Sequence, residues 1–450
     1  MIKNDVAFLK KFKFSGYMQG QFQVAQKAGT ATYDGGNFAS TTDKRFMMRR
    51  ARLKLNYIGN NSEFVFQFDA SDNGNYIAGN TFTVVDSVGT VPGPHYGKPY
   101  THTGGNVLSS GNGKMINAFN IKDLYYKFTD PWLKTFSITV GNMNRPFGFE
   151  IGYSSSNRES PERGRMSQIL FPGERDMGAM LTIQRPSTAK LNWIKIEAGM
   201  YNGTSSGYPE YDKQKDFIGH IVLSKSLMKE HIKLSGGASY YNGGWRAGTI
   251  NVYNMSTDDQ AKDGTTTLSQ KAFVLNKLSS TNDYVARIYK GVDAQASCDF
   301  PFGITTLRGE YIWGQNPGTA QVQNSSDIYM RKFSGAYLYF IQNILKSKND
   351  IVVKYDWYDP NTDVTASDMP TTTTTYSNGN FKSIGANDIK YSTLGLGWVY
   401  HWDQNVKITA YYEIMKNETS NNLKTTLING EGLNGDLTDN VFTLRIQYKF

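Results

Sequence analysis

The last ten residues of the chain, Val441 to Phe450, alternate between apolar and polar side chains without interruption. The apolar members of this pattern are Phe442, Leu444, Ile446, Tyr448 and Phe450, and the polar members are Thr443, Arg445, Gln447 and Lys449. Because successive side chains of a strand point to opposite faces, this segment offers an apolar face to lipid and a cationic face to an interior. The pattern predicts a membrane-spanning strand of an outer-membrane β-barrel with a watery, charged lumen.

The composition agrees with a barrel. Aromatic residues make up 14% of the chain, as expected where aromatic girdles surround a barrel whose lumen and loops are polar. No run of about 18 apolar residues occurs, so no transmembrane helix is predicted. The N-terminal residues MIKNDVAFLKKFKF lack an apolar stretch long enough for a signal-peptide core. We therefore expect a mature chain, with its signal peptide already removed, in the outer membrane of a Gram-negative bacterium.

The same alternation recurs along the chain and predicts about 16 strands, an even number as bacterial barrels require. The predicted strands lie near residues 14–25, 45–58, 62–70, 115–129, 135–143, 177–186, 191–203, 213–223, 231–244, 284–299, 302–315, 330–343, 350–359, 390–402, 405–416 and 439–450. Short links alternate with long polar ones, as periplasmic turns alternate with external loops. The fold class is therefore all-β: residues 1–450 form one transmembrane antiparallel β-barrel with both termini on the periplasmic side.

The strand from Arg45 to Ile58 carries the strongest chemical signal. If Ala51, Leu53 and Leu55 face lipid, then Arg50, Arg52 and Lys54 stack up the inner wall at a spacing of roughly 7 Å. Guanidinium groups match the oxygens of phosphate and carboxylate. The alternative is that these cations pair with carboxylates across the lumen. The predicted inward acids are Asp69, Asp123, Glu197, Glu310, Asp356 and Glu413.

The loop 144–176 is predicted to fold inward as a constriction loop. Its Pro and Gly residues indicate sharp, ordered turns. Its arginines are balanced by equally many acids, so only the placement of individual arginines can favour anions. The candidate pore-lining and anion-binding residues, besides Arg50, Arg52 and Lys54, are Arg145, Arg163, Arg165, Arg175, Arg308, Arg445 and Lys449.

The sequence resembles the phosphate-selective porin O/P family, particularly its Bacteroidetes members. The resemblance rests on four segments in roughly the first 200 residues: MMRRARLKLNY at 47–57, IKDLYYKFTD at 121–130, VGNMNRPFGFE at 140–150 and LFPGERDMGAML at 170–181. It implies a 16-stranded homotrimeric porin in which an arginine ladder and a lysine cluster conduct phosphate-like anions. Arg50, Arg52 and Lys54 resemble part of that ladder. The candidates for the lysine cluster are Lys290, Lys354 and Lys407.

Other functional classes find little support in the sequence. The 5 histidines show no metal-ligand spacing, and no GxSxG or HExxH motif occurs, so we expect neither catalytic residues nor a metal or other cofactor. The net charge of +9 is spread through alternating strands and is not gathered on one patch, which argues against nucleic acid as a partner.

We therefore expect an outer-membrane porin that passes small solutes by diffusion, with a preference for anions such as phosphate. Its expected partners are small anions and outer-membrane lipid, including lipopolysaccharide. One alternative is a general, weakly selective porin. Another is a barrel plugged by its loops that serves as a scaffold for other outer-membrane proteins, using the segments 71–114 and 245–283.

Overall fold

The structure is a computed structural model of the whole chain. It describes residues 9–70, 120–204, 212–256, 260–262, 267–268, 270–319, 327–370, 379–424, 427–428 and 430–450, and the backbone alone of 81–85 and 99–103. Most of the segment 71–114 therefore lies outside the described residues. Among the described residues, no helix is long and apolar enough to cross a membrane.

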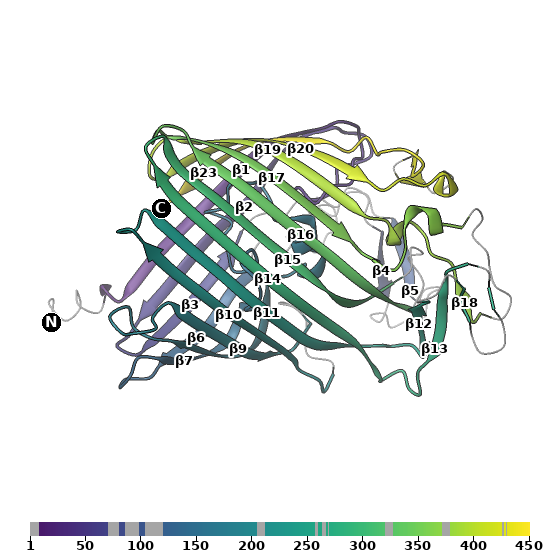
Figure 1. Cartoon of the computed structure of the whole chain (residues 1–450), viewed down its shortest axis with the longest axis horizontal. Coiled ribbons are helices and arrows are strands. Elements are labelled where there is room, and N and C mark those ends of the chain that lie inside the picture. Colours follow the sequence, from purple (N-terminus) through teal and green to yellow (C-terminus); the bar gives the residue numbers. More distant parts are fainter. Residues whose placement is uncertain are drawn as a thin grey trace, which may run out of the picture.

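Sixteen antiparallel strands form a closed barrel, because β1 pairs with β2 on one side and with the last strand, β23, on the other (Figure 1). This confirms the predicted fold, and each predicted strand overlaps an observed one. The barrel strands are β1 (Phe12–Ala25), β2 (Lys44–Ile58), β3 (Ser62–Asp69), β6 (Asn120–Thr129), β7 (Phe136–Asn144), β8 (Arg175–Gln184), β9 (Ile194–Tyr201), β10 (Asp216–Leu227), β11 (Ile232–Arg246), β14 (Tyr284–Phe300), β15 (Gly303–Thr319), β16 (Ile328–Asn343), β17 (Asn349–Asp359), β19 (Tyr391–His401), β20 (Val406–Asn417) and β23 (Val441–Lys449).

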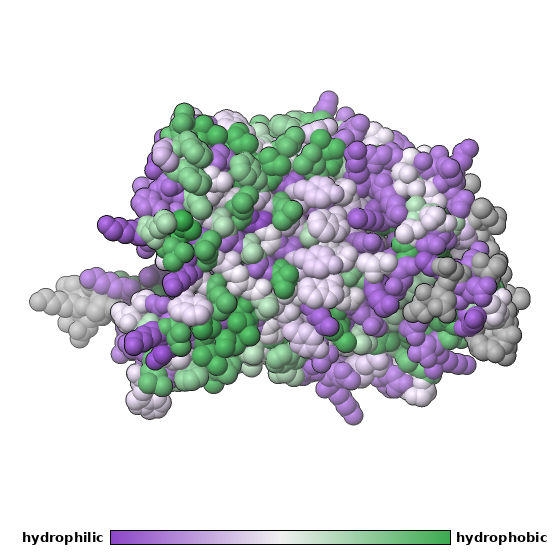
Figure 2. Space-filling model, viewed as in Figure 1, coloured by the Kyte–Doolittle hydropathy of each residue, from purple (hydrophilic) through white to green (hydrophobic). Residues whose placement is uncertain are grey.

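The outer wall is apolar because every second side chain of each strand points outward. On β16, Leu338 and Phe340 are exposed, whereas Tyr337 and Tyr339 between them are buried in the barrel. Figure 2 shows hydrophobic side chains spread over the wall between the two ends of the barrel. A closed barrel leaves no unpaired strand edge in lipid, and its apolar wall places the protein in the outer membrane.

The first barrel strand, β1, begins and the last, β23, ends at the end of the barrel that carries the short turns (Figure 1). One of these turns is held by Asp130, whose carboxylate accepts backbone hydrogen bonds from Leu133 (2.6 Å) and Phe136 (2.8 Å). In barrels of this kind the short turns face the periplasm, so the long loops at the other end are extracellular.

The extracellular loops contain secondary structure that the strand pattern did not predict. β12 (Asn251–Met255) pairs with β13 (Phe273–Lys277) and runs parallel to the start of β16, and β13 also pairs with β18 (Phe381–Lys382). Tyr253, Phe273 and Tyr329 pack together in an apolar cluster between these loops. The remaining elements are β4 (Thr81–Val85), β5 (Pro99–Thr103), α2 (Arg165–Leu170), η2 (Ala366–Asp368), η3 (Ala386–Asp388), η4 (Asn421–Leu423), β21 (Leu427–Ile428) and β22 (Glu431–Gly432).

Candidate functional site

The segment between β7 and β8, residues 145–174, lies inside the barrel. It begins with a turn at Gly148, which has a positive φ of 58°. A Cβ atom at Gly148 would collide with the carboxylate of Glu310, so the close approach of the segment to β15 requires glycine. We call residues 145–174 the lumen segment.

Hydrogen bonds tie the lumen segment to strands on several sides of the wall. The Ser155 hydroxyl bonds to that of Tyr17 on β1 (2.6 Å), and the Ser160 hydroxyl to that of Tyr339 on β16 (2.7 Å). Ser239 on β11 accepts a hydrogen bond from the Gly148 amide (2.8 Å). The segment thus bridges the lumen.

An apolar core fixes one part of the lumen segment. Phe147 and Phe171 are almost completely buried and lie 5.1 Å apart between ring centroids. The Phe171 ring also packs against Tyr241 and Tyr289, which point inward from β11 and β14. This part of the lumen is therefore filled by protein.

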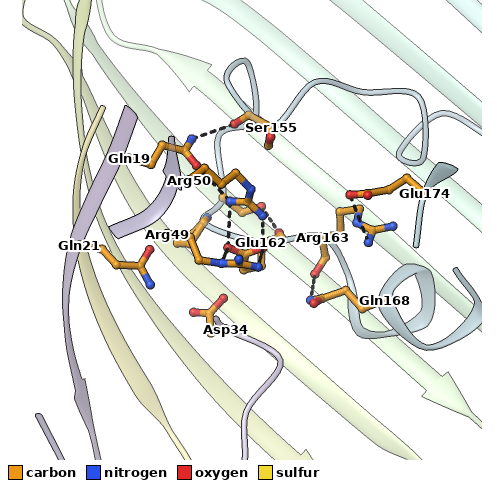
Figure 3. Close-up of polar contacts among 12 residues, drawn as sticks. Gln19, Gln21, Asp34, Arg49, Arg50, Ser155, Glu162, Arg163, Gln168 and Glu174 are labelled. Atoms are coloured by element: carbon orange, nitrogen blue, oxygen red, sulfur yellow. Dashed lines mark hydrogen bonds and ion pairs between the residues drawn. The ribbon is translucent and has the colours of Figure 1, made fainter. Parts of the chain in front are cut away.

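Three arginines converge on one carboxylate of the lumen segment, Glu162. Figure 3 shows two of them, Arg49 and Arg50, beside it. Arg49 and Arg50 on β2 each bind it through two nitrogens, with shortest distances of 2.8 Å and 2.5 Å. Arg445 on β23 donates from Nη2 to Oε1 at 3.0 Å. We call Arg49, Arg50 and Arg445 the triple-arginine site. Burial alone would raise the pKa of Glu162, but the three guanidinium groups hold that pKa well below its ordinary value.

Arg49 was not among the residues predicted to face the lumen. Strict alternation from Arg50 would turn Arg49 toward lipid, but the register of β1 and β2 shifts between Gln19 and Gly20. This bulge lets both Arg49 and Arg50 point inward. The sequence carries a signal of it, because the outward residues Met48 and Ala51 are separated by an odd number of positions.

A cavity of about 320 Å³ lies beside the lumen segment toward the short turns. Five cations and two carboxylates line it: Arg52, Lys54, Arg158, Arg175, Lys449, Asp123 and Glu174. Arg52 binds Asp69 (2.8 Å), and Arg175 binds Asp123 (2.6 Å). Lys449 donates to the side-chain oxygen of Asn157 (3.0 Å). The cavity therefore brings together four of the predicted pore-lining residues, Arg52, Lys54, Arg175 and Lys449.

Arg158 is a second residue that the sequence analysis did not select. Its side chain is buried, and its Nε and Nη1 atoms have no hydrogen-bond partner among the described residues. It lines the same cavity from the lumen segment. No sequence signal distinguishes Arg158 from the other arginines of that segment.

Two further predicted cations of the lumen segment, Arg145 and Arg163, hold its turns together. Arg145 donates to the Gly173 carbonyl and lies over the Phe171 ring. Arg163 pairs with Glu174 at 3.4 Å. Burial alone would raise the pKa of Glu174, but Arg163, Arg175 and Arg52 hold that pKa well below its ordinary value.

Arg165 and Arg308 lie apart from both groups. Arg165 lines a second cavity of about 340 Å³ toward the extracellular loops, together with Arg331 and Asp439. Its guanidinium lies 4.2 Å from the ring centroid of Tyr391. Arg308 on β15 binds Glu159 of the lumen segment at 3.0 Å.

The three candidates for a lysine cluster do not come together. Lys354 is buried in the wall and pairs with Asp356 (3.1 Å), and Lys407 donates to the carbonyl of Arg158 (2.9 Å). The expectation for Lys290 is wrong. Its side chain is exposed on the outer face of β14, because it shares the outward phase of Val292.

All six acids predicted to face inward do so. Asp69 and Asp123 each pair with an arginine of the wall, as noted above. Glu310 accepts a hydrogen bond from the Tyr337 hydroxyl (2.9 Å), and Glu197 pairs with Lys195 (2.7 Å). Asp356 and Glu413 are buried in the same half of the lumen as Lys354. Pairing thus involves many of the lumen cations, as the alternative interpretation expected.

The sequence and structure were compared with those of known proteins, and only solved structures are similar. No family model and no curated protein matches the sequence. Among solved structures, OprB of Pseudomonas putida is 11% identical over 99% of this chain and 96% of its own, with a TM-score of 0.51. The outer membrane channel DcaP of Acinetobacter baumannii is 12% identical over 98% of this chain and 97% of its own, with a TM-score of 0.50. At these identities the likeness is one of fold, and the fold is that of a closed outer-membrane β-barrel.

Proposed function

We propose that this protein is an outer-membrane porin through which small solutes diffuse passively, with a preference for anions. The observation that carries the proposal is the charge of the cavity that flanks the lumen segment on its periplasmic side. Five cations and two carboxylates line this cavity, and Asp69, the partner of Arg52, adds a third carboxylate. In the cavity toward the extracellular loops, Arg165 and Arg331 line the wall with Asp439, and Asp388 pairs with Arg331. A positive potential focused between low-dielectric walls raises the local concentration of anions.

The selectivity test is the reversal potential of the purified protein in planar lipid bilayers under a KCl gradient. We expect the reversal potential to have the sign of a chloride-selective current. Replacing Arg50, Arg52 and Lys54 together by glutamine should reduce the ratio of anion to cation permeability, because two of these residues line the periplasmic cavity and Arg50 lies next to it in the wall. An unchanged ratio would refute the role of these residues.

Phosphate is the anion that we propose as the natural solute, in line with the resemblance to the phosphate-selective porins. The guanidinium forks of Arg52 and Arg175 and the two free donors of Arg158 suit a tetrahedral oxyanion. Phosphate added to the bilayer chamber should then block the chloride current at low concentration. A current that phosphate leaves unchanged would favour a general, weakly selective porin.

A plugged scaffold barrel is the second candidate, and the contacts of the lumen segment favour it. Hydrogen bonds reach from this segment to β1, β11 and β16, and the Phe147 and Phe171 rings fill part of the lumen. A plugged barrel would show negligible single-channel conductance in the same bilayers and would copurify with other outer-membrane proteins.

A further inference from the structure

The triple-arginine site holds more positive charge than Glu162 can balance. Three guanidinium groups meet one carboxylate, and the side chains of Arg50, Arg445 and Glu162 are at most 6% exposed. The carboxyl of Asp34 also lies beside the site (Figure 3). Burial and the neighbouring Glu162 raise the pKa of Asp34, so its negative charge is disfavoured there. Buried charge without a counterion is strongly unfavourable, and the site therefore favours a further negative charge.

The geometry around Glu162 is that of an oxyanion site. Both carboxylate oxygens of Glu162 accept hydrogen bonds from guanidinium nitrogens. Oε1 accepts from Arg49, Arg50 and Arg445, and Oε2 accepts from Arg49 and Arg50. The amide oxygen of Gln19 accepts from Nη1 of Arg50, and that of Gln21 accepts from Nε of Arg445, so the two glutamines orient both guanidinium groups. A phosphate presents the same pair of oxygens as a carboxylate and carries more negative charge.

We infer that the triple-arginine site is an oxyanion-binding site, and that Glu162 is its tethered occupant, which a phosphate-like anion displaces. Displacement replaces one negative group by another and breaks no covalent bond. It also removes the ion pairs of Glu162 with β2 and β23. Arg445 still donates to the Pro161 carbonyl (2.6 Å) and Arg52 to the Ser155 hydroxyl (3.2 Å), so displacement loosens the lumen segment without detaching it. The inference rests on the proposed anion preference and specifies where along the lumen the anion is held.

The same segment provides a matched contrast. Glu159 also binds the wall, but it forms an ion pair with a single arginine, Arg308. Arg308 is further covered by the rings of Phe149 and Tyr153, at 4.7 Å and 4.6 Å from their centroids. Removing Glu159 therefore leaves one shielded arginine without its partner, whereas removing Glu162 leaves three arginines that converge.

The test measures thermal unfolding of the purified full-length protein in detergent with inorganic phosphate at constant ionic strength. Without phosphate, Glu162→Ala should unfold at a lower temperature than the wild type. Phosphate should raise the unfolding temperature of the variant in a saturable manner. The phosphate concentration that gives half of this rise should be about tenfold or more lower for the variant than for the wild type, because no carboxylate competes with phosphate. Glu159→Ala should respond to phosphate as the wild type does. Equal phosphate responses of Glu162→Ala and the wild type would overturn the inference.

A second variant covers the case in which Glu162→Ala does not fold. Glu162→Asp keeps the charge but withdraws it from the arginines, so phosphate should stabilise it at lower concentration than the wild type, and an unchanged response would again overturn the inference. This readout does not depend on conduction. A saturable phosphate response in a protein without anion-selective current would uphold the site and refute the proposed porin function. An anion-selective current without a saturable phosphate response would support the porin function and refute the oxyanion-binding site.

Discussion

At the scale of single residues, Asp439 links the charge of the extracellular cavity to pH. It lies two residues before β23 and is the acid among the described residues that line this cavity. Burial raises the pKa of Asp439 to about 6, although Arg165 opposes the shift. A raised pKa means that the fold favours the neutral acid, so the group's contribution to stability is present at low pH and is lost as the pH rises through about 6. Acidification from about pH 7 to pH 5 should therefore remove one negative charge beside Arg165 and Arg331.

The expected result is a reversal potential that shifts toward anion selectivity on acidification. Asp439→Asn should already show the shifted value at about pH 7 and should lose this part of the pH dependence. Any other group that titrates affects the reversal potential of the wild type and of Asp439→Asn alike, so the difference between their pH profiles reports on Asp439. Asp283→Asn is a suitable control, because hydrogen bonds from Ser279 and Ser280 lower the pKa of Asp283 and keep it ionised in this range. Identical pH profiles of the wild type and Asp439→Asn would contradict the assignment.

Residues differ in how far their sequence context reveals their position. Arg52 and Lys54 follow the alternation of apolar neighbours, and this pattern placed both correctly in the wall. Arg49 was missed because a bulge changes the phase of β2, and Lys290 was misplaced although it shares the outward phase of Val292 on β14. The partner of Arg49 could not be predicted at all, since Glu162 is distant in sequence and meets it only through the path of the lumen segment.

At the scale of elements, the lumen segment should loosen when its apolar anchor is removed. Phe171 is completely buried against Phe147, Tyr241 and Tyr289, so Phe171→Ala leaves a large cavity. Loss of a buried phenylalanine side chain typically costs about 3–5 kcal/mol. We expect the barrel to stay folded, because its strands pair independently of Phe171, and the segment to detach more often. Single-channel conductance should rise, and trypsin should cleave at Arg163 or Arg165.

The control for this variant is Phe149→Ala in the same segment. Phe149 is half-buried and packs mainly against Tyr153 and Arg308, so its removal should change conductance and cleavage less than Phe171→Ala. If both variants resist trypsin as the wild type does, the apolar packing is not what holds the segment in place.

The strands of the barrel were predictable and the folding of its loops was not, for a physical reason. A transmembrane strand must show an apolar residue at every second position, which is visible in local sequence. β12, β13 and β18 face no lipid and are specified by pairing between segments such as Phe273–Lys277 and Phe381–Lys382, which are far apart in the chain. The Pro and Gly residues of the lumen segment indicate its turns, but its contacts around the wall depend on the closed barrel.

At the scale of the whole molecule, the depth of a residue on the outer wall should decide what a charge costs there. Leu338 is 57% exposed and lies between Phe340 and Ala336 on the outward row of β16, within the apolar wall. Leu345 is 73% exposed but lies in the short turn after β16, outside the barrel strands. The same substitution, leucine to lysine, thus places one charge among lipid chains and the other in water.

We expect Leu338→Lys to lower the free energy of unfolding by about 2–4 kcal/mol, the cost of a lysine facing lipid near the midplane of a bilayer. Leu345→Lys should change it little. The measurement is urea unfolding of the protein refolded into lipid vesicles, followed by tryptophan fluorescence. In detergent micelles, whose apolar layer adapts more easily to a charge, the difference between the two variants should shrink. Equal stability of both variants in vesicles would mean that the row through Leu338 does not face the bilayer core, and the orientation of the wall would have to be revised.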